Sequence, residues 1–328
     1  MTLQVSVVVP TCKRPDLLER CLSALLAQDF PPPAYEVIIV DDAACPETRQ
    51  QVECCAHSAR KSGHTVRYIA MSSACCTHGP AAARNKGWQA AKAAIIAFTD
   101  DDCVPTPDWL KTAIGAFKDD VVGISGRIIV PLTHRPTDYE YNAAHLEQSE
   151  FVTANCFYRR ATLAQVGGFD ERFTAPWRED SDLFFSLLER GASCIHVPQA
   201  VVIHPIRPAS WGVSIRQQRK SMFNALLYKK HPVLYRQKVQ ATPPLHYYGI
   251  VATLLLACVG ILRRSPFLAL SGIGLWSWLT GRFCLRRLRN TSHAPEHVAE
   301  MIVTSAIIPP LAIFWRLRGM LKFRVFFL

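Results

Sequence analysis

The sequence contains no acidic residue over a long stretch: neither Asp nor Glu occurs between Gly191 and Pro295. Acidic residues stay scarce beyond it, because from His246 onward ten Lys and Arg residues accompany only Glu296 and Glu300. A C-terminal third that is both basic and apolar favours contact with an anionic membrane surface. Nucleic acid is a weaker alternative, because no recognition helix and no basic strand with interleaved aromatic residues supports it. We therefore expect membrane lipids, and no nucleic acid, among the partners.

The Cys-x-x-Cys spacing is also missing, although the chain has 12 cysteines. Two adjacent pairs, Cys54-Cys55 and Cys75-Cys76 with His78 nearby, match no common zinc site, so zinc is the less favoured interpretation. A secretory signal is lacking too, since MTLQVSVVVPT begins a strand pattern without a charged start and a long apolar core. We expect the N-terminal half to lie in the cytoplasm, with its cysteines as reduced thiols.

Long apolar runs are absent from the C-terminal third, and its three apolar segments have only 16, 17 and 18 residues. Such lengths lie at the short edge of what crosses a hydrocarbon core of ~30 Å. The segments are Tyr247–Leu262, Phe267–Phe283 and Val298–Trp315. We expect Pro309-Pro310 to break the third segment, and residues 246–328 to be membrane-associated helices. Residues 211–245 predict a basic amphipathic helix that lies on a membrane surface or packs on a core.

The N-terminal part alternates strand and helix patterns. Continuous β-branched runs predict strands buried on both faces, and Leu at helical spacing predicts helices between them. The expected order, strand, helix, strand, strand, helix, strand, falls in VSVVVPT, RPDLLERCLSALLAQ, YEVIIVDDA, TVRYIAM, PAAARNKGWQAAK and AIIAFTDDD. This alternation predicts an α/β fold with a doubly wound, mostly parallel sheet and helices on both faces. Further strand and helix patterns continue to about Pro205.

Polar side chains stand where these strands end. Thr11 follows the first strand, Asp41 and Asp42 follow the second, and Asp100–Asp102 follow the fourth. In a parallel sheet, ligands bind beyond the carboxyl ends of the strands. Neighbouring carboxylates repel one another, so we expect a cation among them, and hard oxygen ligands suit Mg²⁺ or Mn²⁺. A helix cap is the alternative, but a cap needs one Asp and not three.

Five motifs, in this order, resemble those of the family 2 glycosyltransferases, which have the GT-A fold. They are VSVVVPTCKRPDLLERCLSALLAQ, EVIIVDDA, AAARNKGWQAAKAAIIAFTDDDCVPTPDWL, GGFDERF and WREDSDLFFSLLERG. The resemblance covers about Val5 to Pro205. It implies a GT-A catalytic domain over residues 1–210, a nucleotide-diphosphate sugar as donor, and Mg²⁺ or Mn²⁺ as cofactor.

The resemblance also implies roles for the residues of the first two strand ends. Pro10 and Thr11 would line the nucleotide pocket. Asp41 would bind the base, with Asp42 close by.

Further donor-side roles follow from the same resemblance. Arg84 and Asn85 would face the donor, with Arg84 a candidate for binding the diphosphate. Asp100 and Asp102 occupy the ends of the family's Asp-x-Asp motif, and Asp101 fills its variable middle position. Asp100 would face the ribose or the sugar and help to bind the metal, which Asp102 would hold.

The acidic stretch WREDSD matches the family's Glu-Asp pair, whose Asp is the general base. The resemblance therefore assigns the base to Asp180, with Glu179 and Asp182 as its acidic neighbours. A base is needed because an acceptor hydroxyl attacks poorly unless its proton is removed during bond formation. The alternative is that these acids only stabilise a helix N-terminus. His204 stands where several relatives place a metal-ligating His, although a His at a strand end is often structural.

Three departures from the family pattern bear on the function. The usual Asp-Asp-Gly-Ser turn is DDAACPE here, and SSACCTHGPAAARN replaces the usual loop before the Arg-Asn pair. The Gln-x-x-Arg-Trp signature of processive polymer synthases is absent, so we expect transfer of a single sugar. The acceptor that would explain the basic apolar tail is a lipid-linked sugar or another glycan precursor of the cell envelope.

The sequence thus predicts a membrane-associated, metal-dependent, inverting glycosyltransferase. One alternative is a nucleotidyltransferase that forms the sugar nucleotide, but PTCKRPD lacks the glycines of the loop which that class carries after its first strand. The other alternative is a non-catalytic, membrane-anchored protein that binds a sugar nucleotide. The intact carboxylates at Asp100–Asp102 and Asp180 argue against it.

Overall fold

The computed structural model describes residues 2–72 and 77–327. Cys75-Cys76, one of the two cysteine pairs of the zinc alternative, lies outside the described residues, as does part of the loop before Gly79. The chain folds as two compact units. The α/β unit comprises Met1–Pro131 and His145–Pro205, and the helical unit comprises Leu132–Ala144 and Ile206–Leu328. The division into domains 1–210, 211–245 and 246–328 stays a prediction.

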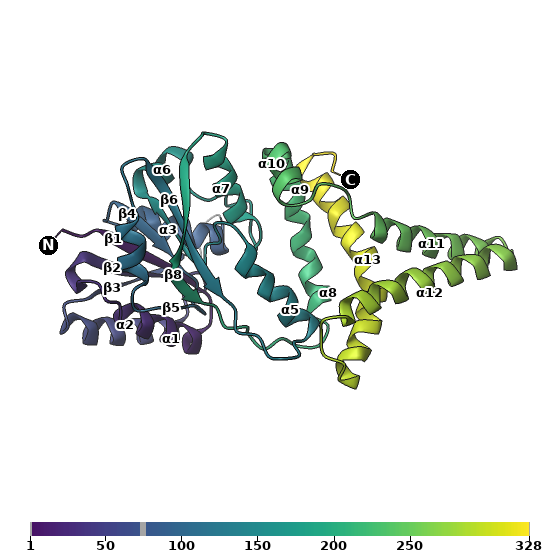
Figure 1. Ribbon diagram of the computed structural model, residues 1–328, viewed down its shortest axis with the longest axis horizontal. Coiled ribbons are helices and arrows are strands. Elements are labelled where there is room, and N and C mark those ends of the chain that lie inside the picture. Colours follow the sequence, from purple (N-terminus) through teal and green to yellow (C-terminus); the bar gives the residue numbers. More distant parts are fainter. Residues whose placement is uncertain (1, 73–76, 328) are drawn as a thin grey trace. The chain divides into compact units, whose positions relative to one another are not determined.

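The α/β unit, purple to teal in Figure 1, contains one sheet and the helices that pack on it. Its strands are β1 (Val5–Thr11), β2 (Tyr35–Asp41), β3 (Thr65–Ala70), β4 (Ile95–Phe98), β5 (Val104–Pro105), β6 (Val121–Ile129), β7 (Cys156–Arg159) and β8 (Ser193–Ile203). Its helices are α1 (Pro15–Leu26), α2 (Pro46–Arg60), α3 (Pro80–Ala90), α4 (Trp109–Gly115), α6 (Arg160–Val166) and α7 (Glu179–Leu188), with short 3₁₀ turns at Pro32–Ala34 and His145–Gln148.

The sheet has the strand order β3-β2-β1-β4-β7-β6-β8-β5. Strands β3, β2, β1 and β4 are parallel, β7 is antiparallel to both of its neighbours, and β8 runs parallel to β6. Every residue of β1 and β2 is buried, as their continuous apolar runs predict. The expected α/β fold is therefore confirmed, with a parallel first half and a mixed second half.

Helix α3 packs directly on the strands that lead to the candidate site. A Cβ atom on Gly87 would lie 2.3 Å from a methyl group of Val8 in β1, so glycine permits this close approach. Asp42, at the end of β2, accepts a hydrogen bond from the backbone N–H of Gly79, directly before α3. These contacts fix the helix that carries Arg84 and Asn85.

The helical unit, mainly green and yellow in Figure 1, consists of α5 (Asp138–Ala144), α8 (Val213–Gln217), α9 (Phe223–Lys230), α10 (Pro232–Lys238), α11 (Leu245–Leu262), α12 (Pro266–Leu288) and α13 (Pro295–Phe323), with a 3₁₀ turn at Gln218–Met222. Of the helices in the described residues, α11 and α13 are long and apolar enough to cross a membrane. The middle apolar segment forms α12, which extends to Leu288 and ends in basic residues.

The expected break at Pro309-Pro310 is wrong, because α13 continues through both prolines. Ile308 and Pro309 are buried, so packing of the helix holds the backbone where proline removes hydrogen bonds. The predicted helix within residues 211–245 is broken into α8, a 3₁₀ turn and α9. Its apolar Met222 packs against α13, where Gly319 leaves room for the Met222 backbone.

Two helices of this unit pair through small residues. A Cβ atom on Gly260 of α11 would lie 2.3 Å from the backbone nitrogen of Ala269, and one on Gly272 of α12 would lie 2.4 Å from that of Ala257. The backbones of α11 and α12 therefore touch, and their large apolar side chains point outward. Those of Leu255, Phe267 and Leu270 are 60%, 78% and 70% exposed.

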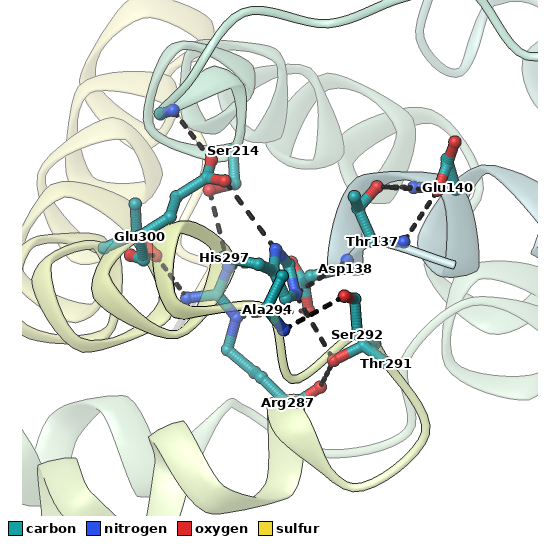
Figure 2. A network of polar contacts seen from close by, with 12 residues as sticks. Thr137, Asp138, Glu140, Ser214, Arg287, Thr291, Ser292, Ala294, His297 and Glu300 are labelled. Carbon is teal, nitrogen blue, oxygen red and sulfur yellow. Dashed lines mark hydrogen bonds and ion pairs between the residues drawn. The ribbon is translucent and has the colours of Figure 1, made fainter. Parts of the chain in front are cut away.

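A buried polar network holds α5 to the other helices of this unit (Figure 2). The Arg287 guanidinium pairs with the Asp138 carboxylate at 2.7 Å, and it also donates hydrogen bonds to Thr304 and Ser305 of α13. The side chains of Arg287 and Asp138 are 9% and 7% exposed. Arg287 of α12 therefore joins α5 through an ion pair and α13 through hydrogen bonds.

Candidate active site

The strand ends gather at one edge of the parallel half of the sheet. Thr11 is paired with Asp41 across β1 and β2, and Val8 is paired with Phe98 across β1 and β4. Because β4 ends at Phe98, the three aspartates Asp100–Asp102 follow beside Thr11. Pro10 belongs to β1, where its partner is Val40.

Each of the three aspartates has a different partner. Asp100 accepts a hydrogen bond from Arg84 at 2.7 Å, Asp101 accepts one from Thr11 at 2.8 Å, and Asp102 lies 3.6 Å from His204. Each carboxylate therefore has its own neighbour, Arg84, Thr11 or His204, and these contacts offset the repulsion among the three aspartates that the sequence predicts.

Asp101 points into the protein and is 2% exposed. Burial raises its pKa, against the effect of the Arg14 guanidinium, which lies 3.2 Å away, and of the Thr11 hydroxyl. Arg14 was not among the residues predicted from the sequence, although its position shortly after the first strand was an available signal. Asp101 thus anchors the strand-end turn to β1, and its substrate-binding role stays a prediction.

Asp102, Cys103 and His204 form a group whose potential ligand atoms all lie within 4.8 Å of one another. A carboxylate and an imidazole suit Mn²⁺, and a carboxylate suits Mg²⁺. Burial and the nearby carboxylates of Asp100 and Asp102 raise the pKa of the Cys103 thiol well above its usual range. A soft sulfur ligand also suits Mg²⁺ and Mn²⁺ less well than carboxylate or imidazole. The residues present therefore fit a hard divalent cation held by Asp102 and His204.

Asp41 and Asp42 organise the loops around the site. The completely buried Asp41 carboxylate accepts hydrogen bonds from the backbone N–H groups of Ala43 and Cys45 and from the hydroxyl of Tyr68. Asp42 is more exposed and contacts His78 and Gly79. Binding of the base by Asp41 stays a prediction.

Arg84 is 3% exposed and joins two acidic segments of the unit. One guanidinium nitrogen donates to Asp100 at 2.7 Å, and another donates to Glu179 at 2.9 Å. Burial opposes the positive charge, but the carboxylates of Asp100 and Glu179 outweigh it and raise the pKa of Arg84. The expected contact of Arg84 with the diphosphate stays a prediction.

Asn85 fastens the Gly-Gly turn of the GGFDERF motif to α3. Its amide donates to the Phe169 carbonyl and to Glu171, and its oxygen accepts hydrogen bonds from the Phe169 N–H and the Trp88 indole. A Cβ atom at Gly168, where φ is +71°, would lie 2.5 Å from the Asn85 oxygen. The Asn85 amide is therefore fully used within the protein, a role that the sequence did not indicate.

Glu179 and Asp180 form the first turn of α7. Glu179 is 3% exposed, whereas Asp180 is partly exposed and receives hydrogen bonds from the Ser181 N–H and hydroxyl. Burial and the charge of Asp180 raise the pKa of Glu179, against the effect of Arg84. Burial also raises the pKa of Asp180, although the Ser181 N–H and the charge of Arg178 oppose the shift. A partly exposed carboxylate with a raised pKa is suited to accept a proton.

Comparisons with known proteins agree with the resemblance of the motifs. The family model for "Glycosyl transferase family 2" matches residues 6–170, and the model for "Glycosyl transferase family group 2" matches residues 95–286. Among solved structures, the mannosyltransferase PcManGT from Pyrobaculum calidifontis, in complex with GDP-Man and Mn²⁺, aligns with a TM-score of 0.57. That alignment covers 98% of this chain and 88% of the other, at 18% identity, so the likeness concerns the fold.

Three curated relatives are similar to between 62% and 76% of this chain. The pre-mycofactocin glycosyltransferase of Mycobacterium tuberculosis is 31% identical over 62% of this chain and 43% of its own length. Glycosyltransferase AglE of Haloferax volcanii is 24% identical over 65% of this chain and 70% of its own length. The validoxylamine A glucosyltransferase of Streptomyces hygroscopicus is 24% identical over 76% of this chain and 61% of its own length. The chain thus spans less than two thirds of two of these three relatives.

Proposed function

Since this chain belongs to glycosyltransferase family 2, we propose that it transfers a single sugar from a nucleotide-diphosphate sugar to an acceptor hydroxyl, with inversion and with the aid of a divalent cation. The observation that supports this best is the division of the acidic residues into two clusters. Asp102 and His204 lie at the strand ends, and Asp180 lies at the start of α7. A metal-binding pair and a separate base are the two groups that such a reaction needs.

The strand-end cluster would act on the departing group. Asp102 and His204 would hold Mg²⁺ or Mn²⁺, which when bound neutralises charge that develops on the diphosphate. Asp100 would face the ribose or the sugar while Arg84 holds it in place at 2.7 Å. Thr11 and Arg14 hold Asp101, and so the turn that carries Asp100 and Asp102, against β1.

The α7 cluster would act on the acceptor. Asp180 would take the proton of the attacking hydroxyl at its carboxylate. Ser181 donates to one Asp180 oxygen, Oδ1, at 2.6 Å and so fixes the carboxylate. A single carboxylate that removes this proton opposite the leaving group would invert the configuration at the anomeric carbon.

The acceptor, in this proposal, is a lipid-linked sugar or another envelope glycan precursor, used at the cytoplasmic face of a membrane. Helices α11 and α13 support membrane association by their length and composition. The exposed apolar side chains of α11 and α12 form a surface that lipid would cover. The exposed basic residues Arg263, Arg264 and Arg286 suit anionic headgroups.

The test begins with a panel of nucleotide sugars, each added to the full-length protein in detergent with and without Mn²⁺. The correct donor should raise the unfolding temperature only when the metal is present. That donor is then offered with lipid-linked acceptors, and NMR of the product gives the anomeric configuration. Retention of configuration, or transfer unaffected by chelation of the metal, would contradict the proposal.

Membrane association is tested separately by flotation of the full chain with vesicles that contain anionic lipid. We expect flotation, and we expect protease added outside sealed inverted membranes to digest the α/β unit, because that unit would face the cytoplasm. A full-length protein that stayed soluble without detergent would contradict the membrane assignment.

A further inference from the structure

The first turn of α7 lacks the usual means of fixing a helix start. Arg178, directly before the helix, has a left-handed backbone with φ of 77°, which is unfavourable for a residue other than glycine. No side chain at this position caps the helix. The position of Asp180 therefore depends on contacts that the first turn makes elsewhere.

The contact between Glu179 and Arg84 anchors this turn. Both side chains are 3% exposed, and their hydrogen bond measures 2.9 Å. The same guanidinium binds Asp100 at 2.7 Å, so one buried group joins the strand-end turn to the start of α7. Its neighbour on α3, Asn85, holds the Gly-Gly turn that precedes α7 in the chain. Helix α3 thus braces both acidic clusters.

Two buried atoms of this pair lack a hydrogen-bond partner among the described residues, Arg84 Nε and Glu179 Oε2. Unpartnered buried polar atoms cost free energy, so packing of the surrounding structure must hold the pair in place. At 3% exposure neither side chain offers much surface to a ligand. This burial favours a role within the protein over direct contact with the donor.

Resting on the proposed function, we infer that Arg84 and Glu179 are positioning residues that set the place of the Asp180 carboxylate relative to the metal-binding turn. Glutamate is required at 179 because its charge pairs with Arg84 while its neighbour Asp180 carries out the proton transfer. Arginine is required at 84 because a planar guanidinium can bind two carboxylates at once, whereas a lysine ammonium is a compact point charge. A misplacement of about 1 Å at such a site can lower a rate by ~100-fold.

The experiment compares Glu179→Gln, Arg84→Lys and the double variant with the wild-type protein. Arg67→Lys is the matched control, because Arg67 also binds a buried carboxylate, that of Glu36, at 2.9 Å, but on the edge strand β3. Steady-state transfer gives kcat and KM, calorimetry gives donor affinity with Mn²⁺, and hydrogen–deuterium exchange of the peptide covering residues 176–188 reports the helix start directly.

We expect Glu179→Gln to lower kcat by roughly 10- to 100-fold while donor affinity changes less than about threefold. Exchange in the first turn of α7 should rise. Arg84→Lys should do the same, and the double variant should lose no more than the worse single variant, because both changes break the contact between Arg84 and Glu179. The Arg67→Lys control should match the wild type in kcat and in the exchange of α7.

Two outcomes would overturn the inference: a kcat and an α7 exchange unchanged in Glu179→Gln, or a loss confined to donor affinity in Arg84→Lys. A loss confined to donor affinity would instead indicate that Arg84 binds the diphosphate. If Arg84→Lys fails to fold, Glu179→Gln still decides, because it keeps the side-chain shape and the Asp100 contact. Failure of the proposed function can be told apart, because the wild-type protein itself would then transfer no sugar. Hydrogen–deuterium exchange would still test whether the contact between Arg84 and Glu179 fixes the first turn of α7.

Discussion

Arg84 and Arg287 are both buried arginines, one in each unit, and each gathers groups from distant parts of the sequence. Arg84 binds two carboxylates, those of Asp100 and Glu179, at an edge of the sheet where acids are in excess. Arg287 binds one carboxylate, that of Asp138, and several hydroxyls, in a unit where acids are scarce. Arg84 is thus a single positive charge among several carboxylates, whereas Asp138 is a carboxylate in a region that is mostly basic.

This difference distinguishes the candidate active site from a structural junction. Two further carboxylates, Asp102 and Asp180, lie close in sequence to the two that Arg84 binds. In the proposed function they hold the metal and accept the proton. Around Arg287 the single carboxylate is paired and the remaining donors go to Thr304 and Ser305. The other acids of this network, Glu140 and Glu300, also have partners within the helical unit, so we expect the arrangement around Arg287 to act on stability alone.

The largest expected effect is the loss of stability when the ion pair of Arg287 is removed. Arg287→Leu should destabilise the helical unit by about 3–5 kcal/mol, because it leaves the buried Asp138 carboxylate unpaired. Unfolding of the full-length protein in detergent, followed by heat or denaturant, measures the change. Replacing Asp138 by Leu in the same chain should recover part of the loss, since no unpaired charge then remains.

The neighbouring Arg286 is exposed and provides the control. Arg286→Leu should change stability by less than about 0.5 kcal/mol, as is usual for surface positions. Neither variant should alter the affinity of the α/β unit for donor and Mn²⁺. Near-wild-type stability of Arg287→Leu would show that the ion pair is dispensable.

The next effect concerns the base. Asp180→Asn should lower transfer by roughly two or more orders of magnitude, the contribution of general-base catalysis, and leave donor binding intact. Single-turnover transfer at saturating donor measures the loss, and calorimetry checks binding. Asp182→Asn is the comparison variant, because Asp182 lies in the same helical turn and is 3% exposed. Nearly normal turnover of Asp180→Asn would move the base to Asp182 or Glu179.

The sequence predicted the strands that end at this site well, because apolar runs such as those of β1 and β2 are buried along their whole length. It also predicted which carboxylates gather, because parallel strands end at the same edge. It did not indicate α2, whose buried residues are only Thr48, Val52 and Ala59, too few for a clear helical pattern.

Pairing between distant residues could not be read from the sequence. Nothing local links Arg84 to Glu179, or Asp138 to Arg287, 149 positions apart. Such contacts depend on the packing of α3 and of α12, which the pattern of single segments does not contain. For the same reason Pro309-Pro310 was misjudged: a local rule predicted a break, and packing of α13 overrode it.

A smaller effect is expected at the metal-binding pair. Asp102→Ala should weaken Mn²⁺-dependent donor binding by more than about tenfold, or ~1.4 kcal/mol, while the fold persists. Calorimetric titration with donor and Mn²⁺ measures it. Asp119→Ala removes an exposed carboxylate elsewhere and should bind normally. An unchanged affinity for both ligands in Asp102→Ala would move the metal away from the strand ends.

The smallest expected effect is a shift in the pH dependence of transfer, which depends on the pKa of Asp180. Burial raises the pKa of Asp180, so transfer should fall, as pH is lowered, at a higher pH than an ordinary aspartate would give, since the base acts only when deprotonated. The charge of Arg178 opposes this shift. Arg178→Gln should therefore move the acid limb of the kcat profile upward, whereas Arg178→Lys, which keeps the charge, should leave it in place. A limb that moves equally in both variants would mean that backbone placement at Arg178, and not its charge, controls the base.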